Sequence, residues 1–442
     1  MSKIYFIKFL ILSLFINVAC EHGPRSGKDD EVLAQGPMGP KDLPLDATVK
    51  IYFENTLSMD GYINGNTDFK DVFRELLVDV DNEKEIDYEI EFYLVNNELN
   101  QEHFDVPSIK ISEKLTPQST NNKGNKGSSN FEDILNTVLE NQEGDVISVL
   151  MADFIYSPGG ETDTPSALNK LRTYTQDAFL RAGKQNSKMD TRIYSFTSKF
   201  DGTYFDINNK HIKGVEKRPY YYFVMAPSNL MQIFEKNILS QLKINPGFVN
   251  EAFFSSMNFS TLKTQVLAST ANNGRLNTRD GIEVIGYPKQ GNLEFVVVLD
   301  LSLLPLNDHY LLNKDNYQLL NPEFSIKDMG VVQGKTIKFD GLGSTKIDPS
   351  SQVSMKGKNF THAILFSTDG LVSEDLKFAL KKKVPSWVLQ ADSEDDQNIK
   401  SDSLEQTKTF GFAPLVEGVA KAYEQQAGNN DYFNVKITVN NN

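Results

Sequence analysis

The chain has 442 residues, of which 39% are hydrophobic and 24% are charged, and its formal net charge is -14. This length exceeds one ordinary hydrophobic core, so it predicts two domains, or three, in a protein of globular composition. The acidic balance argues against nucleic acid as a partner, and the single cysteine, Cys20, excludes an intramolecular disulfide and a thiolate metal cluster.

Residues 1–20 have the pattern of a secretory signal peptide. Lys3 and Lys8 precede an apolar run from Phe9 to Ile16, which is too short to span a hydrocarbon core as a helix, and small residues stand ahead of Cys20. The segment resembles a bacterial lipobox, although Asn17 replaces the usual apolar residue. The resemblance implies a lipoprotein anchored through Cys20. The alternative is plain secretion with an unused thiol.

Residues 21–46 are rich in Gly, Pro, Lys and Asp without any periodicity, which predicts a flexible tether. Within it, Lys28, Asp29, Asp30 and Glu31 resemble the short signal that directs some Gram-negative lipoproteins to the outer face of the outer membrane. They stand farther from the cysteine than is usual. The resemblance implies a place in the outer membrane and leaves the periplasmic and external faces open. An ordinary solvated charge run is the alternative.

Residues 47–246 alternate strand and helix patterns. After an opening strand at Val49–Phe53, the period of apolar residues predicts the following order: helix 67–80, strand 86–94 at a sheet edge, helix 131–139, strand 146–151, helix 165–183, strand 192–200, strand 220–225 and helix 229–242. Asp201-Gly202 favours a projecting β-hairpin, and residues 117–128 are expected to form a mobile loop. This order predicts an α/β domain with a Rossmann-like, mostly parallel sheet covered by helices on both faces.

Residues 247–442 show short apolar runs between turn residues. Strands are expected at 251–259, 293–299, 335–339, 362–366, 376–381 and 433–439. A single helical stripe covers Thr409 to Tyr423. The pattern predicts a mostly-β, immunoglobulin-like sandwich with one helix packed on it.

Three loops of the α/β region carry oxygen-bearing side chains. Glu54, Thr56 and Ser58 follow the opening strand at alternate positions, Ser129 precedes a helix, and Asp153 follows a strongly apolar strand. In this order and context they resemble the three motifs of von Willebrand factor type A (vWA) domains, over roughly residues 47 to 243. The resemblance implies a divalent cation held at the carboxyl edge of the sheet by these five residues.

The donor set suits Mg²⁺ or a similar divalent cation, which favours oxygen ligands. Only Glu54 and Asp153 would be anionic, so the ion would keep positive charge and an open coordination position. An acidic side chain of a partner could fill that position. The resemblance therefore implies a binding or adhesion module for an unknown protein or glycan ligand.

The chain departs from the family pattern at three places. Glu54 replaces an aspartate, Phe154 stands where the family tends to have glycine, and Ser129 with Glu132 has the spacing of a helix capping box. A degenerate site on a retained scaffold is thus the alternative to a bound ion, and a structural envelope protein is the alternative to a binding module. A phosphoester hydrolase with Thr56 or Ser58 as nucleophile is the third, weakened because no histidine or lysine base accompanies them.

Overall fold

The computed structural model describes residues 46–127, 130–156, 163–186, 188–259, 262–279, 281–369, 374–393 and 395–440. The expected signal peptide with Cys20, residues 21–45 of the expected tether with Lys28, Asp29, Asp30 and Glu31, and the expected site residue Ser129 therefore lie outside the described residues.

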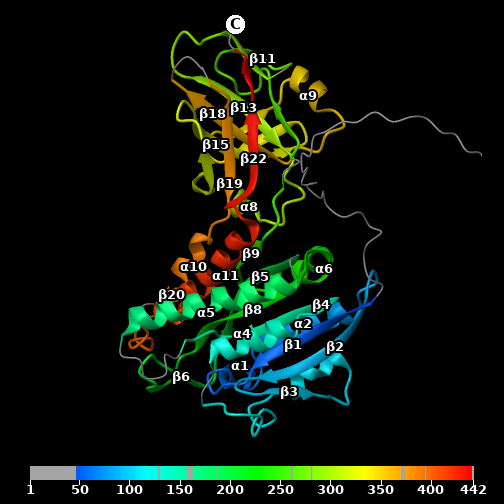
Figure 1. The fold of residues 1–442 in the computed structure, drawn as a ribbon, viewed down its shortest axis with the longest axis vertical. Helices are drawn as coiled ribbons and strands as arrows, with labels where there is room; N and C mark the ends of the chain where they lie inside the picture. The colour runs from blue at the N-terminus through cyan, green and yellow to red at the C-terminus, as the bar shows by residue number, and fades with distance from the viewer. Residues whose placement is uncertain are drawn as a thin grey trace, which may run out of the picture. The chain divides into compact units, whose positions relative to one another are not determined.

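A seven-stranded sheet of order β3-β2-β1-β4-β8-β5-β9 organises the described residues up to Ser255 (Figure 1). β1 is parallel to β2 and to β4, whereas the other neighbouring pairs are antiparallel. The strands are β1 (Asp46–Glu54), β2 (Asp87–Val95), β3 (Leu99–Glu102), β4 (Val146–Ala152), β5 (Met189–Lys199), β8 (Lys217–Pro227) and β9 (Phe248–Ser255).

The expectation of a mostly parallel sheet is therefore wrong, and the sheet is mixed. The physical reason lies in the connection after β5. No helix carries the chain back across the sheet there; a small hairpin of β6 (Thr203–Phe205) and β7 (His211–Lys213) returns it as β8, which pairs with β5 along its whole length. Strands joined in this way are antiparallel. The predicted hairpin exists, but its turn lies at residues 206–210 rather than at Asp201-Gly202. The strand expected at a sheet edge is β2, but β3 pairs with its outer side and forms that edge of the sheet instead.

Helices cover both faces of the sheet, as the sequence predicted. Alternate side chains of β1 enter different cores: Ile51 and Phe53 pack on one face and Tyr52 on the other. The first face is covered by α1 (Asp60–Ile63), α2 (Asp68–Asp81), α3 (Ile111–Lys114), α6 (Ser228–Phe234), the π-helical η2 (Glu235–Leu239) and α7 (Ser240–Leu242). The second is covered by α4 (Phe131–Glu140), α5 (Thr164–Gln185), α10 (Ser386–Gln390) and α11 (Phe412–Ala427).

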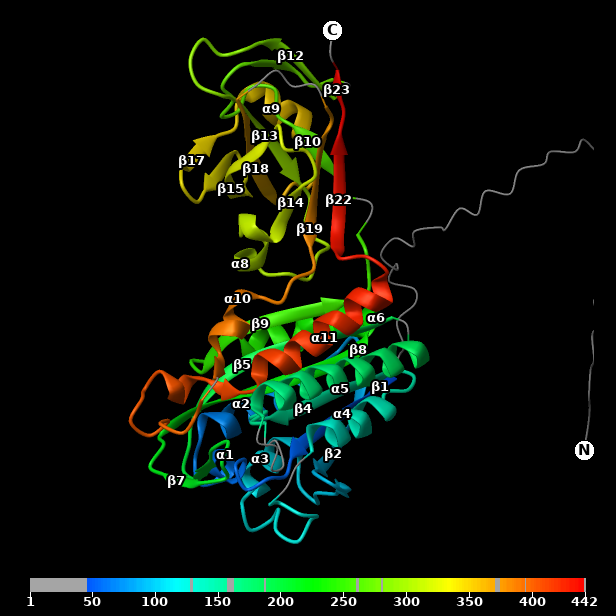
Figure 2. The same cartoon turned by 60° about the vertical axis from the view of Figure 1, so that its left-hand side comes forward.

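Two segments expected in the C-terminal sandwich belong to this α/β layer instead. β9 overlaps the strand expected at 251–259 and pairs with β5 as the last strand of the sheet. α11, expected to pack on the sandwich, packs along α5 in the same core (Figure 2). Their contact is close at Gly418, where an added Cβ would lie 2.5 Å from the carbonyl oxygen of Arg172. The sheet thus extends past the boundary expected at residue 246.

The free edge of β9 is capped by side chains instead of by another strand. The indole Nε1 of Trp387 donates a hydrogen bond to the carbonyl oxygen of Glu251 at 3.0 Å, and the Tyr432 hydroxyl donates to that of Phe253 at 2.9 Å. Edge strands expose backbone groups that can pair with another chain, and these two contacts cover part of that edge.

The remaining strands form several smaller sheets in which pairing is antiparallel, except between β12 and β23 and between β20 (Asp392–Ser393) and β21 (Thr409–Phe410). A six-stranded sheet comprises β10 (Thr264–Val266), β13 (Leu293–Leu299), β18 (His362–Thr368), β15 (Ser325–Gln333), β16 (Thr336–Phe339) and β17 (Gly343–Lys346). Two three-stranded sheets comprise β14 (Tyr317–Leu319), β19 (Leu376–Lys381) and β22 (Asp431–Ile437), and β11 (Arg275–Asn277), β12 (Ile282–Gly286) and β23 (Val439–Asn440).

One hydrophobic core joins these sheets. Phe295 and Phe366 of the six-stranded sheet share it with Phe378 and Phe433 of the β14-β19-β22 sheet, and the Phe366 and Phe378 rings lie 5.2 Å apart. The expected strands at 293–299, 335–339, 362–366, 376–381 and 433–439 are found as β13, β16, β18, β19 and β22. The short α8 (Asp308–Leu311) and α9 (Pro349–Met355) lie in the connections.

Candidate functional site

Glu54 and Asp153 lie at the same edge of the seven-stranded sheet. β1 and β4 are parallel neighbours in which Phe53 is paired with Met151, so both strands end together. Glu54 is the last residue of β1, and Asp153 directly follows β4. Each residue is only 1% exposed. The fold therefore brings these two carboxyl groups, far apart in the sequence, to one buried rim.

Thr56 and Ser58 lie in the loop that leaves β1 at this rim. Their hydroxyl oxygens are 3.0 Å apart, and the Met59 backbone N–H points to Thr56 Oγ1 at 3.4 Å. Burial raises the pKa of Asp153, while the nearby Ser58 hydroxyl opposes this shift. Asp153 Oδ1 accepts a hydrogen bond from the Ile155 N–H at 3.2 Å, but its buried Oδ2 has no hydrogen-bond partner among the described residues. A carboxylate oxygen without a partner is a ligand atom with an open position.

The start of α4 lies beside the loop that carries Asp153. The Phe131 ring at the first position of α4 stacks on the Phe154 ring with centroids 5.3 Å apart. The N-cap of α4 is Asn130, whose Oδ1 accepts a hydrogen bond from the Glu132 N–H at 3.1 Å. The capping box expected from Ser129 and Glu132 is therefore wrong, because the helix begins one residue later and Glu132 stands at its second position.

Phe154 occupies the position where the vWA pattern tends to have glycine. Its φ angle is 53°, in the left-handed region that glycine enters freely and other residues enter at a cost of about 1–2 kcal/mol. The side chain is fully buried and also packs on Phe223, with ring centroids 4.3 Å apart. The chain thus keeps the backbone conformation that a glycine would favour and compensates the strain with aromatic packing.

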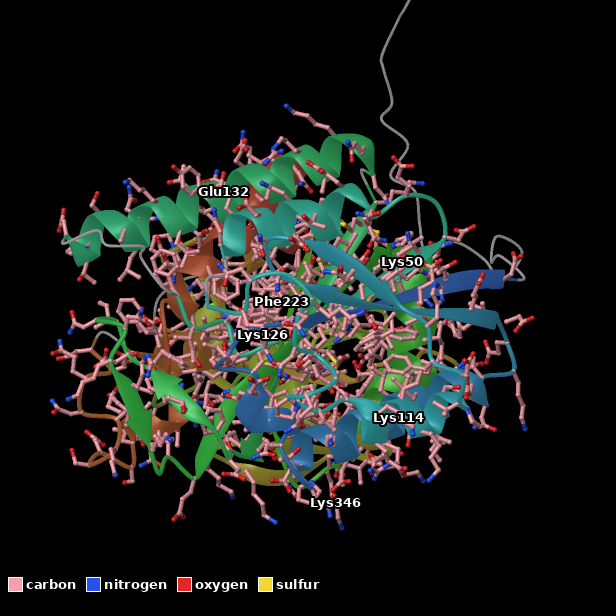
Figure 3. The ribbon with its side chains drawn as sticks, turned by 90° about the horizontal axis from the view of Figure 1, so that it is seen from below. Lys50, Lys114, Lys126, Glu132, Phe223 and Lys346 are labelled. Carbon is pink, nitrogen blue, oxygen red and sulfur yellow. The ribbon has the colours of Figure 1, made fainter. Side chains whose placement is uncertain are left out.

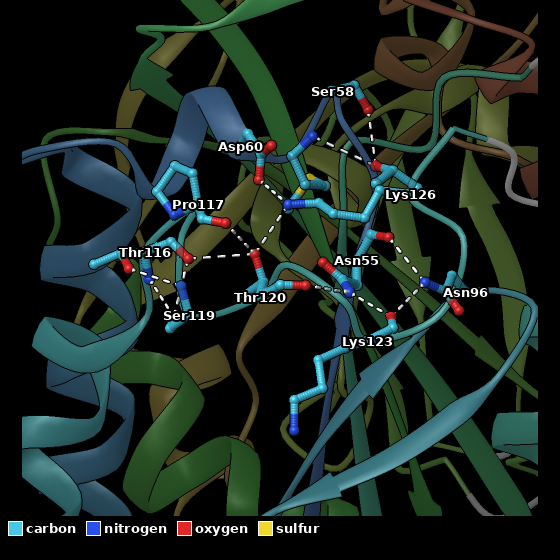
Figure 4. A network of polar contacts seen from close by, with 12 residues as sticks. Asn55, Ser58, Asp60, Asn96, Thr116, Pro117, Ser119, Thr120, Lys123 and Lys126 are labelled. Carbon is cyan, nitrogen blue, oxygen red and sulfur yellow. Dashed lines mark hydrogen bonds and ion pairs between the residues drawn. The ribbon is translucent and has the colours of Figure 1, made fainter.

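The loop expected to be mobile at 117–128 is anchored to the site over its described part (Figure 4). Asn55, which is 0% exposed, donates from Nδ2 to the carbonyl oxygens of Thr120 at 3.1 Å and Lys123 at 2.8 Å. Asn96 donates from Nδ2 to the same Lys123 carbonyl at 3.0 Å, and the Leu57 N–H donates to the Lys126 carbonyl at 3.0 Å. Because buried side-chain amides donate hydrogen bonds to these backbone carbonyls, the described part of the loop is held in one conformation.

The Lys126 ammonium belongs to the same network. It forms an ion pair with Asp60 and donates to Thr120 Oγ1 at 2.9 Å, and its side chain is only 8% exposed. Figure 3 labels Lys126 near the middle of the view from below. These contacts fix the loop beside α1 and the Thr56–Ser58 turn.

The buried Arg218, whose charge opposes the rise in the pKa of Asp153, was not singled out by sequence reasoning. The Arg218 guanidinium on β8, 1% exposed, stands 4.7 Å from the centre of the Tyr204 ring, and the Tyr204 hydroxyl donates to Asp396 Oδ2 at 2.5 Å. The Tyr62 hydroxyl donates to the Pro219 carbonyl oxygen at 2.6 Å. The only local signal is an arginine two residues before the run of buried aromatic residues that begins at Tyr220, and nothing local connects it to Asp396.

Glu54, Thr56, Ser58 and Asp153 supply only oxygen atoms, which is the donor chemistry of Mg²⁺. Asp153 Oδ2 has no hydrogen-bond partner among the described residues, which is consistent with a cation ligand. Two buried carboxyl groups at one rim are also consistent with a bound cation. Within the described ranges no group of three or more His, Cys, Asp or Glu side chains lies close enough to hold a metal ion, so hydroxyl groups would have to complete the set.

Comparisons with protein-family models, with curated proteins and with solved structures gave no match for this chain. In the part of the chain that the structure describes, no helix combines the length and the apolar character needed to cross a membrane.

Proposed function

We propose that this chain is a lipoprotein of the cell envelope, anchored through Cys20, whose vWA-like α/β region is a protein-binding or adhesion module that uses a divalent cation. In this proposal Glu54, Thr56, Ser58, Ser129 and Asp153 hold the cation, and the C-terminal sheets form an immunoglobulin-like sandwich. The carrying observation is that Glu54 and Asp153 end two adjacent parallel strands and leave the buried Asp153 Oδ2 without a hydrogen bond from the described residues.

The charge of the site supports a cation. A carboxylate removed from water needs a hydrogen bond or an opposite charge, because desolvation of an ion costs several kcal/mol. Burial raises the pKa of Asp153, which shows that the protein groups around it do not fully offset that cost. A divalent cation would supply the missing charge, and the uncharged hydroxyls of Thr56 and Ser58 would add ligands without neutralising it.

The charge of the bound cation also explains how binding of a partner would depend on the metal. When bound, the cation supplies a positive centre with room for one more oxygen ligand. The residues of this chain position that centre: Asn55 and Asn96 hold the neighbouring loop, and Phe154 holds the loop after β4. An acidic side chain of a partner protein is the ligand that this arrangement favours, with an acidic glycan as the other source of the same carboxylate chemistry.

Titration calorimetry of the full chain in detergent with MgCl₂ and MnCl₂ tests the metal. We expect one site that is lost in a Ser58→Ala, Asp153→Ala double variant. The matched control is Asp300→Ala, Ser302→Ala, since Ser302 Oγ donates to Asp300 Oδ1 at 2.5 Å in an exposed loop with the same residue types. Absence of heat with both metals in the wild-type protein would remove the cation from the proposal.

The anchor and the partner require separate tests. Metabolic labelling with a fatty acid is expected to mark the wild-type chain and not a Cys20→Ala variant. The wild-type chain and the Asp300, Ser302 control variant should both capture a partner, and a chelator should abolish this capture. The Ser58, Asp153 double variant should capture none. Equal capture by all variants would place the binding surface elsewhere.

A further inference from the structure

A cleft of about 430 Å³ lies on the β5–β9 side of the seven-stranded sheet. Its floor is formed by side chains of these two strands, among them Asp190, Arg192 and Phe253. One wall comes from α6, η2 and the end of α7, and the facing wall is the loop at residues 302–307. The volume falls within the range of small-molecule sites, about 300–1,000 Å³.

The cleft is separate from the candidate cation site. β4 and β5 both pair with β8 and run in the same direction, and Ser148 and Thr191 lie opposite the same residue, Met225. Asp190 therefore lies near the beginning of β5, whereas Asp153 follows the end of β4. A ligand in the cleft would not need the cation.

The charged side chains of the cleft hold one another in place. Glu251 forms ion pairs with Arg192 at 3.2 Å and with Lys243 at 2.8 Å, and Lys243 also pairs with Glu235 at 2.7 Å. Arg192 Nη2 donates a hydrogen bond to the carbonyl oxygen of Pro305 at 2.9 Å, which ties the facing wall to the floor. Polar groups fixed in this way are preorganised, so a ligand does not have to order them.

Two atoms of the floor lack a hydrogen bond. Asp190 is 2% exposed and Arg192 is 3% exposed, yet Asp190 Oδ1 and Arg192 Nε have no hydrogen-bond partner among the described residues. The carboxylate oxygen Oε2 of Glu235 lies 3.5 Å from Arg192 Nε. Buried polar atoms are normally bonded to protein or to another bound group, so these two atoms mark a place for a further polar group.

The helical wall is irregular where it reaches the cleft. Between α6 and α7 the chain forms the π-helical η2, and its first two residues, Glu235 and Lys236, line the cleft. π-Helical turns are rare and occur frequently at functional sites. This irregularity is independent of the two unbonded atoms and points to the same place.

The charges that line the cleft balance. Three are carboxylates and three are cations: Asp190, Glu235, Glu251, Arg192, Lys236 and Lys243. An ionic ligand of either sign would bring an unpaired charge into this cleft, which disfavours it. A neutral hydroxyl group, by contrast, can donate to a carboxylate and accept from a guanidinium or an ammonium group.

We propose that this cleft binds a short neutral saccharide. Its hydroxyl groups would bond to the balanced set of charged side chains. Leu303, which is 54% exposed, and the buried Met231 would contact the C–H groups of the sugar ring from opposite walls. A few fixed polar groups together with apolar walls are the usual composition of a small-molecule site.

Saturation-transfer difference NMR of the full chain, in a detergent without a sugar head group and with EDTA present, tests this proposal. The probes are glucose, galactose, maltose, lactose and cellobiose, and we expect a saturable signal from at least one. Gln232→Trp, which adds an indole to the helical wall from an exposed position, should abolish this signal. The matched control is Gln241→Trp, the same change at an exposed position of α7 that does not line the cleft, and it should leave the signal unchanged.

A second blocking variant guards against a folding defect. Leu303→Trp fills the cleft from the facing wall and should also abolish the signal, so the test holds if Gln232→Trp fails to fold. No saturable signal from any neutral probe, or an unchanged signal in a folded blocking variant, would overturn the cleft as the binding site.

Charged probes test the class of ligand. Glucosamine and glucuronate carry one positive and one negative charge, and both should bind more weakly than the neutral probe. Tighter binding of either would overturn the assignment to a neutral saccharide. Because EDTA is present throughout, failure of the proposed cation site would leave all of these results unchanged.

Discussion

The Phe154 ring stacks on the Phe131 ring at 5.3 Å while the Phe154 backbone remains in the left-handed region at φ 53°. The stack joins the first residue of α4 to the loop after β4, which carries Asp153. The start of a helix and the loop after a strand are thereby held against each other. The strained backbone is retained because the aromatic contacts outweigh it.

At position 154 a glycine variant should be more stable than an alanine variant, which is the reverse of the usual order. Phe154→Ala removes the buried ring but keeps the strained backbone, and we expect a loss of about 3–5 kcal/mol. Phe154→Gly removes the same ring but relieves the strain, so it should be about 1 kcal/mol more stable than the alanine variant. Urea unfolding measures both. An alanine variant as stable as the glycine variant would contradict the strain at this position.

Gly418 should resist enlargement because α11 approaches α5 closely there. An added Cβ would meet the carbonyl oxygen of Arg172 at 2.5 Å and Thr175 Cβ at 2.7 Å, neither of which can move alone. We expect Gly418→Ala to lower the free energy of unfolding by about 1–3 kcal/mol.

Gly183 provides the matched control for Gly418. It lies inside α5, and the three atoms nearest to an added Cβ there all belong to the amide end of the Gln426 side chain, which could turn away at the loss of its hydrogen bond to the Phe179 carbonyl. The gain in helix propensity, about 1 kcal/mol, offsets part of this contact, so Gly183→Ala should change stability little. Equal effects of the two substitutions would contradict the packing of α11 on α5.

Asn55 should determine the order of the loop at 115–127. Asn55→Ala removes two hydrogen bonds to the backbone of Thr120 and Lys123, and leaves both carbonyls without this donor. We expect a loss of about 2 kcal/mol and faster proteolysis within the loop. Asn64→Ala, which removes amide contacts to the exposed Asp201, should stay within about 0.5 kcal/mol of the wild type. An equally protected loop in both variants would show that other contacts hold it.

Asp190 should make stability fall as pH rises through the mildly acidic range. Burial raises its pKa from 3.8 to about 6, although Ser255, Ser228, Arg192 and Lys382 oppose the shift. The folded protein therefore binds this proton more tightly than the unfolded chain does. The contribution of the protonated carboxyl to stability is fully present below about pH 4 and is lost as pH rises to about 6.

Asp190→Asn removes this titration. Relative to the wild type, its free energy of unfolding should rise between about pH 4 and pH 6, by about 3 kcal/mol at most for a shift of this size. Denaturant unfolding across that range measures the difference. A difference that is constant or that falls with pH would refute the assignment.

Much of the secondary structure of the α/β region could be predicted from local sequence patterns. The three-and-four spacing of Phe69, Val72, Phe73 and Leu76 specified α2, and the uninterrupted apolar run of β4 specified a strand buried on both faces. The direction of the strands and their pairing could not be predicted from local patterns. The stretch Ala252 to Phe254 is apolar whether it pairs with β5 or with another sheet, and the stripe of α11 looks the same on either core. Those choices depend on the whole chain.

The candidate site divides in the same way. The meeting of Glu54 and Asp153 could be predicted because strand ends in a parallel pair fall at one edge. The participation of Asn55, Arg218 and Asp396 could not, since each depends on a contact with a distant segment that no spacing encodes. Phe154 was noticed as a departure from a pattern, and its φ angle explains why a non-glycine residue is tolerated there only with strong packing.

The cap on the free edge of β9 gives the protein an intrinsic optical probe. Trp387 is the sole tryptophan of the chain, and its indole is bonded to the Glu251 carbonyl and packed against Phe412. Its emission should therefore shift to the red when the segment around α10 separates from β9. Fluorescence at a single wavelength can thus follow this one junction in real time, without any attached dye.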